Sequence, residues 1–254
     1  MLRTLSVVWV IGLALTGMFA GQSHRVALVC GPAVQDPEQL DAARKGLYRS
    51  LRERADIHQI IFMGNLVKDD ASLLSPTLAT LDSLSCPWFC VPGDGDRDFY
   101  RPATSLRPGG HLPSRDRDFV TWQAVMPSSD TSWVARGIRW IVLNNIRTIS
   151  RTQARTLKAQ EKGLYVGNDY TGGLNERQKR WLEDWLIRTP ERQWIALCTH
   201  LPLSQCAGAD TLASILSRHK NTRQICAVPC SDPEVISVSG HGGIYTLDIR
   251  NGGW

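Results

Sequence analysis

Short apolar runs alternate with amphipathic helical segments along this chain, and this alternation limits the folds that it can adopt. Residues 26–30 form one apolar run, and a helix signal follows in which Asp36 is the N-cap and Pro37 lies in the first turn. The apolar stripe of this helix repeats at helical spacing and consists of Leu40, Ala43, Leu47 and Leu51. A second apolar run, residues 59–63, leads into another helical stretch over 71–84. This order predicts a βαβ unit with two parallel strands.

Further strands and one strong helix signal continue the pattern. We expect strands at residues 88–91, 138–143, 194–198, 235–239 and 245–249. Asn175 and Gln178 have the spacing of a capping box, and Thr189-Pro190 ends the helix that they begin. Its predicted buried face consists of Trp181, Leu182, Trp185 and Leu186. The 254 residues are 43% hydrophobic and contain no linker or repeat, so we expect one α/β domain with a mixed sheet.

The first residues have the pattern of an export signal. Residues 5–20 carry no charge and follow Arg3. We therefore place a signal peptide or N-terminal anchor at residues 1–21 and the folded domain at residues 22–254. Ala20 is small but Met18 is not, which makes a poor cleavage site and leaves an uncleaved membrane anchor as the alternative. The expected location is outside the cytoplasm (periplasmic, secreted or N-terminally anchored), with membrane contact only through this segment.

Seven cysteines fit an oxidising compartment, and their odd number leaves at least one without an intramolecular disulfide partner. Cys86 and Cys90 have the same spacing as Cys226 and Cys230. Each pair lies in or near a predicted strand, and four residues of extended strand span about 13 Å. We therefore expect neither pair to share a metal ion. Buried thiols and disulfides to other cysteines both remain open.

The formal net charge of +5 is too small to indicate a nucleic-acid partner, and none is expected. Residues 94–118 are rich in arginine but contain an equal number of aspartates, so their charges cancel. Another set of cations recurs at helical spacing and consists of Arg147, Arg151, Arg155, Lys158 and Lys162. This set would suit an anionic partner, and an ordinary solvated helix face is the alternative.

Small and polar residues follow the predicted strands, at the positions where α/β sheets gather their ligands. These segments are Cys30-Gly31-Pro32-Ala33, Gly64-Asn65-Leu66-Val67-Lys68-Asp69, Gly93-Asp94-Gly95-Asp96, Thr199-His200-Leu201-Pro202 and Ser239-Gly240-His241-Gly242-Gly243. In order and spacing they resemble the five sequence blocks of the calcineurin-like metallophosphoesterases, especially an exported bacterial branch. The resemblance extends from Val26 to Gly243 and includes residues 140–145 and the Tyr-x-Gly-Gly-Leu stretch that begins at Tyr170.

The resemblance implies a four-layer α/β/β/α sandwich of two mixed sheets, with a two-metal site that hydrolyses phosphate esters. In that family a bridging carboxylate holds both cations, and a water molecule between them attacks phosphorus. Gly31, Ala33 and Gly243 stand where the family has an Asp and two His that hold the first metal. Asn65 stands where it has the bridging Asp, and Gly95 replaces the His that assists the leaving group. The metal-binding blocks are therefore degenerate.

Four residues at the positions of the second metal retain atoms that can coordinate it: Asn65, Asp94, His200 and His241. One carboxylate and two imidazoles suit a single Mn²⁺, Fe²⁺ or Zn²⁺ ion. A dinuclear site is not expected, because two divalent ions about 3.5 Å apart repel by roughly 19 kcal/mol at an effective dielectric constant of 20. A neutral Asn65 does not offset this repulsion. A buried structural His200 and turn-forming Asn65 and Asp94 are the alternative interpretation, and no residue is assigned a catalytic role.

Two functions follow from this pattern. The leading one is a protein descended from metal-dependent phosphoric ester hydrolases, with weak or lost activity, since losing general acid-base assistance alone slows such reactions by roughly 10²- to 10⁴-fold. The alternative is a catalytically dead, exported binding module that holds a phosphate ester or another anionic ligand in the inherited cleft. The sequence does not identify the substrate.

Overall fold

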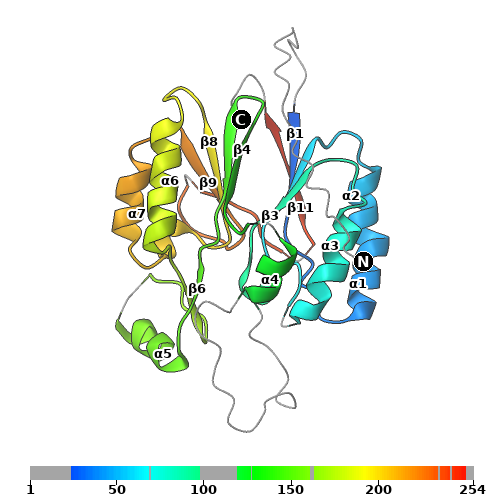
Figure 1. Ribbon diagram of the computed structural model, residues 1–254, viewed down its shortest axis with the longest axis horizontal. Helices are drawn as coiled ribbons and strands as arrows, with labels where there is room; N and C mark the ends of the chain where they lie inside the picture. The colour runs from blue at the N-terminus through cyan, green and yellow to red at the C-terminus, as the bar shows by residue number, and fades with distance from the viewer. Residues whose placement is uncertain are drawn as a thin grey trace, which may run out of the picture.

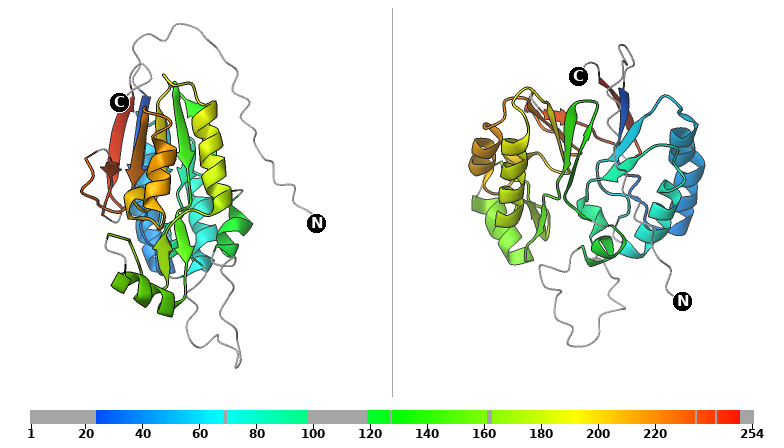
Figure 2. Two further views of the ribbon diagram at one scale, coloured as in Figure 1. Left: turned by 90° about the vertical axis from the view of Figure 1, so that its left-hand side faces the viewer. Right: turned by 45° about the horizontal axis from the view of Figure 1, so that its top comes forward.

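Two β-sheets lie face to face, and helices cover the outer face of each sheet (Figures 1 and 2). The computed structural model describes residues 24–68, 70–97, 119–126, 128–160, 163–233, 235–240 and 242–249. The expected α/β/β/α sandwich of two mixed sheets is confirmed. The predicted export segment, residues 1–21, lies outside the described residues. Within the described ranges no helix is both long enough and apolar enough to cross a membrane.

The first sheet has four strands in the order β11-β1-β2-β3. They are β1 (His24–Val29), β2 (Gln59–Phe62), β3 (Trp88–Cys90) and β11 (Ile244–Ile249). β1, β2 and β3 are parallel, whereas β11 pairs antiparallel with β1. The helices on its outer face are α1 (Pro37–Ala43), α2 (Arg49–Glu53) and α3 (Leu74–Leu81). These elements confirm the predicted βαβ order.

The second sheet has five strands in the order β10-β9-β8-β5-β4. They are β4 (Thr131–Ala135), β5 (Ile138–Val142), β8 (Ile195–Thr199), β9 (Thr222–Cys226) and β10 (Val235–Ser237). Only β4 is antiparallel to its neighbour. The helices on its outer face are α6 (Glu176–Arg188) and α7 (Ala209–Leu216). Other elements include α4 (Val120–Val125), α5 (Arg151–Gln160) and a two-stranded ribbon of β6 (Ile146–Thr148) and β7 (Tyr170–Gly172).

The central strands are buried on both faces, which explains why they are continuous apolar runs. In β1, Val26 and Leu28 join the cluster between the two sheets, whereas Ala27 and Val29 join the cluster beneath the helices. All four side chains are fully buried. Because neighbouring side chains of a strand point to opposite faces, each central strand contributes to two cores.

The first helix begins as predicted but changes geometry in its middle. The Asp36 carboxylate accepts a hydrogen bond from the Gln39 backbone N–H at 2.7 Å, which confirms the N-cap. A π-helical turn over Arg44–Tyr48 then separates α1 from α2. The wider turn shifts the buried face by one residue, so Tyr48 is fully buried whereas Leu47 is only half-buried.

The capping box of α6 is also confirmed. Asn175 Oδ1 accepts from the Gln178 backbone N–H at 2.9 Å, and Gln178 Oε1 accepts from the Asn175 N–H at 3.1 Å. The Gln178 amide also donates to the Asn144 carbonyl at 2.7 Å, which ties this helix to the segment after β5. Leu182 and Leu186 are buried beneath it, as predicted.

His24 at the start of β1 predicts a pH-dependent stability. Burial, with the nearby His58 and Arg136, lowers the pKa of His24 to about 4. The unfolded chain therefore binds more protons than the folded chain between about pH 4 and pH 6.5, so stability rises with pH across this window. We expect His24→Gln to remove about 2 kcal/mol of this rise, measured by urea unfolding at several pH values. An unchanged slope in the variant would contradict the assignment to His24.

Candidate functional site

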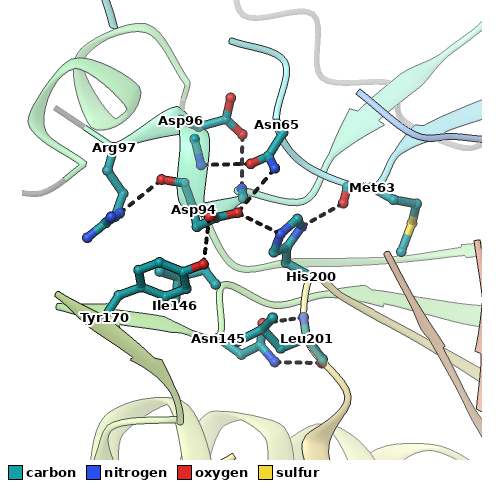
Figure 3. Close-up of polar contacts among 12 residues, drawn as sticks. Met63, Asn65, Asp94, Asp96, Arg97, Asn145, Ile146, Tyr170, His200 and Leu201 are labelled. Carbon is teal, nitrogen blue, oxygen red and sulfur yellow. Dashed lines mark hydrogen bonds and ion pairs between the residues drawn. The ribbon is translucent and has the colours of Figure 1, made fainter. Parts of the chain in front are cut away.

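Three of the four predicted site residues meet where strands β2, β3 and β8 end (Figure 3). Asn65 follows β2, Asp94 follows β3 and His200 follows β8. Asn65 Nδ2 donates to Asp94 Oδ1 at 3.1 Å, and His200 Nε2 lies 3.0 Å from the same oxygen. The fourth, His241, lies outside the described residues. Asn65 and Asp94 follow neighbouring parallel strands of the first sheet, whereas His200 reaches them from β8 of the second sheet.

The ring of His200 is held between two oxygen atoms. Nδ1 lies 3.0 Å from the Met63 carbonyl and Nε2 lies 3.0 Å from Asp94 Oδ1. Both partners are acceptors, and only the doubly protonated imidazolium donates from both nitrogens. Burial alone would lower the pKa of His200, but the hydrogen bond and negative charge of Asp94 outweigh it and raise this pKa above its ordinary value. His200 and Asp94 therefore form a buried ion pair.

Both oxygens of the Asp94 carboxylate accept hydrogen bonds. Oδ1 accepts from Asn65 and His200, and Oδ2 accepts from the Tyr170 hydroxyl at 2.7 Å. Burial would raise the pKa of Asp94, but the bonds from His200, Tyr170 and Asn65 keep it below its ordinary value. Tyr170 was not among the predicted site residues, although it begins one of the matching stretches.

Arg97 and Asp169 hold Tyr170 in this position. The Arg97 guanidinium lies over the Tyr170 ring, 4.6 Å from its centroid, and Arg97 Nη2 pairs with Asp169 Oδ1 at 3.0 Å. Arg97 Nε also donates to the Asp94 carbonyl at 2.9 Å. Both side chains of the ion pair are largely buried, at 9% and 13% exposure, so the contact is protected from solvent. This arrangement links the β6–β7 ribbon to the segment after β3.

Asp96 is a second residue of the site that was not predicted from the sequence. It is fully buried and accepts from the backbone N–H groups of Val67 and Gly93, each at 2.9 Å. Burial raises the pKa of Asp96 to about 7. Its bonds tie the segments after β2 and β3 together, and within them the Gly95 N–H donates to Asn65 Oδ1 at 2.7 Å. The sequence feature that points to this role is an acidic residue among glycines directly after a strand.

Backbone atoms fill the space at the positions where the ligands of the first metal would lie. Gly31 N–H donates to the Gly64 carbonyl at 3.0 Å and Ala33 N–H donates to the Asn65 carbonyl at 2.8 Å. A Cβ atom added at Gly31 would overlap the carbonyl oxygens of Gly64 and Asn65. There is no room at this position for the carboxylate that a two-metal site requires. The described residues therefore do not fit a dinuclear centre.

The described residues of the second metal position do not fit a bound cation in this arrangement either. A cation could bind here only after His200 releases its Nε2 proton and the hydrogen bonds to Asp94 Oδ1 rearrange. In the described ranges, no group of three or more His, Cys, Asp or Glu side chains could hold a metal ion. Ligation by His241 remains a prediction, because this residue lies outside those ranges.

Comparisons with known proteins agree with the fold. No family model and no curated protein matches the sequence. A dimetal phosphatase from Danio rerio superposes with a TM-score of 0.54 at 16% identity, over 85% of this chain and 86% of its own. A purple acid phosphatase from yellow lupin (Lupinus luteus) seeds superposes with a TM-score of 0.50 at 13% identity, over 81% of this chain but only 38% of the lupin protein. Both belong to the calcineurin-like metallophosphoesterase superfamily, so the expected resemblance is confirmed at the level of the fold.

Proposed function

We propose that this chain, which has the calcineurin-like metallophosphoesterase fold, descends from metal-dependent phosphoric ester hydrolases and has lost most or all of their activity. The buried ion pair between Asp94 and His200 carries this proposal. In a metallophosphoesterase site these positions supply metal ligands, whereas here they neutralise one another. Without a metal ion the site lacks a means of activating water at neutral pH.

The neighbouring substitutions support the same conclusion. Asn65 is neutral, and its Oδ1 accepts from Gly95 N–H instead of bridging two cations. Gly95 occupies the position of the residue that would assist the leaving group. A Cβ atom there would lie 2.8 Å from the Val67 carbonyl oxygen, so a larger side chain requires the backbone to move. Both the bridging charge and the acid-base group are missing, and each loss lowers the rate.

Metal content and hydrolysis test this proposal together. We expect elemental analysis of the purified protein to find less than one metal ion per chain. Added Mn²⁺, Fe²⁺ or Zn²⁺ should produce no hydrolysis of an activated phosphodiester above the rate of the buffered metal alone. The opposite result is stoichiometric metal with turnover, both abolished by His200→Ala. That result would show that the ion pair opens to bind a cation.

The alternative function, an exported module that binds an anionic ligand, has one observation in its favour. Helix α5 carries Arg151, Arg155 and Lys158 on its exposed surface and contains no acidic residue. Arg147 on β6 is also exposed. These cations form a surface that suits a phosphorylated or polyanionic partner.

A binding measurement tests this alternative. We expect inorganic polyphosphate to bind the wild-type protein at low salt and to bind a triple variant, R151Q/R155Q/K158Q, at least several-fold more weakly. The exposed pair Arg49 and Glu53 offers a control, because Arg49→Gln removes one cation on another face. Equal affinity of the wild type and the triple variant would exclude α5 as the binding surface.

A further inference from the structure

Strands β6 and β7 and helix α5, which lies between them in the sequence, form a small unit that we call the strap. The two strands make a separate two-stranded sheet. Of the ten residues of α5, Ala154 alone is buried, and Figure 1 shows this helix at the lower left, below α6 and α7. Two-stranded ribbons and helices of this length are marginally stable on their own in water. The strap therefore depends on its contacts with the rest of the protein.

One end of the strap, its base, is joined to the second sheet through backbone groups. The Gly173 N–H donates to the Asn145 carbonyl at 3.0 Å, and the Ala207 N–H donates to the Gly172 carbonyl at 2.9 Å. The buried Asn145 side chain also donates through Nδ2 to the Leu201 carbonyl at 2.8 Å. These bonds fix the base to the segment after β8.

The other end of the strap, its tip, is held by side chains of the strand-end site. The Tyr170 hydroxyl donates to Asp94 Oδ2 at 2.7 Å, and Figure 3 shows the Tyr170 side chain pointing from β7 toward Asp94. Asp169 pairs with Arg97 at 3.0 Å. On β6, Thr148 Oγ1 lies 3.5 Å from Arg97 Nη1. We call these side-chain contacts the latch.

We propose that the latch closes the strand-end site, and that the tip of the strap detaches by local unfolding while the base and both sheets stay folded. Detachment removes the Tyr170 hydroxyl from Asp94 Oδ2 and uncovers this oxygen. A ligand that contacts Asp94 Oδ2 must therefore enter while the latch is open. The proposal concerns access to Asp94 and does not depend on the proposed loss of hydrolysis.

The latch contacts are charged, whereas the strap buries little apolar surface. Tyr170 donates to a carboxylate, and the side chains of the Arg97–Asp169 pair are only 9% and 13% exposed. Hydrogen bonds to charged groups contribute more to stability than neutral ones. Ile146 is buried in the apolar cluster beneath the helices, but it lies at the base. Polar contacts, more than apolar burial, hold the tip closed, and such segments open before the core does.

Hydrogen exchange, followed residue by residue by NMR in the full-length protein, tests the proposal. Two amides report on the tip: the Ile149 N–H donates to the Asp169 carbonyl at 2.9 Å, and the Gly167 N–H donates to the Tyr170 carbonyl at 2.8 Å. The Leu143 N–H, which donates to the Cys198 carbonyl at 3.0 Å, reports on the second sheet.

Tyr170→Phe removes the hydroxyl and keeps the ring. We expect the Ile149 and Gly167 amides to exchange about tenfold faster in this variant than in the wild type, because a hydrogen bond to a charged group is lost. Exchange at Leu143 should be unchanged. Unchanged exchange at Ile149 and Gly167 would show that Tyr170 is not a latch. Equal acceleration at Leu143 would show global unfolding. Either result would overturn the proposal.

Tyr245→Phe is the matched control, because it removes the same hydroxyl from a tyrosine on β11. The Tyr245 hydroxyl donates to the Ser239 carbonyl at 2.5 Å, outside the strap. We expect exchange at Ile149 and Gly167 to remain at the wild-type rate. If Tyr245→Phe accelerates these amides as much as Tyr170→Phe does, the effect is a general loss of stability and the latch is wrong.

Asp169→Asn tests the second contact of the latch. It keeps the size of the side chain and removes the charge that faces Arg97. We expect faster exchange at Ile149 and Gly167 in this variant, and faster exchange again when it is combined with Tyr170→Phe. If Asp169→Asn leaves both amides at the wild-type rate, a latch made of two contacts is excluded.

Discussion

Asp94→Ala is expected to lower the free energy of unfolding by about 3 kcal/mol, because it removes the counter-ion that keeps the buried His200 protonated, and His200 must then lose its proton. The His200 side chain is only 6% exposed, so water does not replace the lost charge. The same substitution removes the acceptor of the Tyr170 hydroxyl and of the Asn65 amide. Urea unfolding of the variant and the wild type at neutral pH measures the difference.

An exposed ion pair elsewhere in the chain is the matched control. Arg49 and Glu53 pair across one turn of α2 with side chains that are 69% and 63% exposed. Glu53→Ala should therefore change the free energy of unfolding by no more than about 0.5 kcal/mol. If Asp94→Ala and Glu53→Ala have equal effects, the ion pair at the strand ends does not stabilise the fold.

A double-mutant cycle isolates the contact itself. His200→Gln and Asp94→Ala are combined, and the double variant should lose less stability than the sum of the two single variants. We expect a coupling of about 1–3 kcal/mol for two groups in direct contact.

The stability of the wild type in added Mn²⁺ is an independent test, because a cation that binds only the folded state raises its free energy of unfolding with concentration. Stabilisation of the wild type by Mn²⁺ would indicate that these residues accept a metal after all.

The sequence predicted the fold well where side-chain periodicity and capping are strong. The apolar run after His24 and the capping box at Asn175 are local signals, and the structure retains both. Strand β9 was not predicted, because Thr222, Arg223 and Gln224 give it a polar sequence and only its last residues are apolar. Its strand geometry comes from pairing with β8 and β10, which is a tertiary interaction. The π-helical turn at Arg44–Tyr48 likewise leaves no local sequence signal.

The composition of the site was more predictable than its chemistry. Asn65 and Asp94 follow adjacent parallel strands of one sheet, so the sequence order was enough to predict that they lie together. His200 follows β8 of the second sheet, and only the packing of the two sheets brings it to the same place. The hydrogen bonds among these three residues depend on side-chain direction and on the partners Met63 and Tyr170. Those partners belong to other elements, and one of them is a backbone carbonyl. A list of ligand-type residues therefore does not distinguish a metal site from an ion pair.

Gly31→Ala is expected to destabilise the protein by about 3 kcal/mol or more, or to prevent folding. The added Cβ would overlap the carbonyl oxygens of Gly64 and Asn65, which are backbone atoms of the neighbouring β2 segment and cannot rotate away. The hydrogen bonds from Gly31 N–H and Ala33 N–H hold the two segments at this distance. Thermal unfolding followed by circular dichroism gives the change in stability.

Gly46→Ala is the same chemical change in open space and should have the opposite sign. Apart from its chain neighbours and its own helix backbone, no atom of the described residues lies within 4 Å of a Cβ added at Gly46, which is exposed within the helical segment. Replacing a helical glycine by alanine stabilises by about 0.5–1 kcal/mol. Opposite effects of the two variants would show that contact with neighbouring backbone atoms, and not the loss of a glycine in itself, leaves no room for a side chain at residue 31. If Gly31→Ala instead folds with wild-type stability, the strand-end segments can separate. A carboxylate at residue 31 would then be compatible with this fold, and closure of the first metal position would no longer support the proposed loss of hydrolysis.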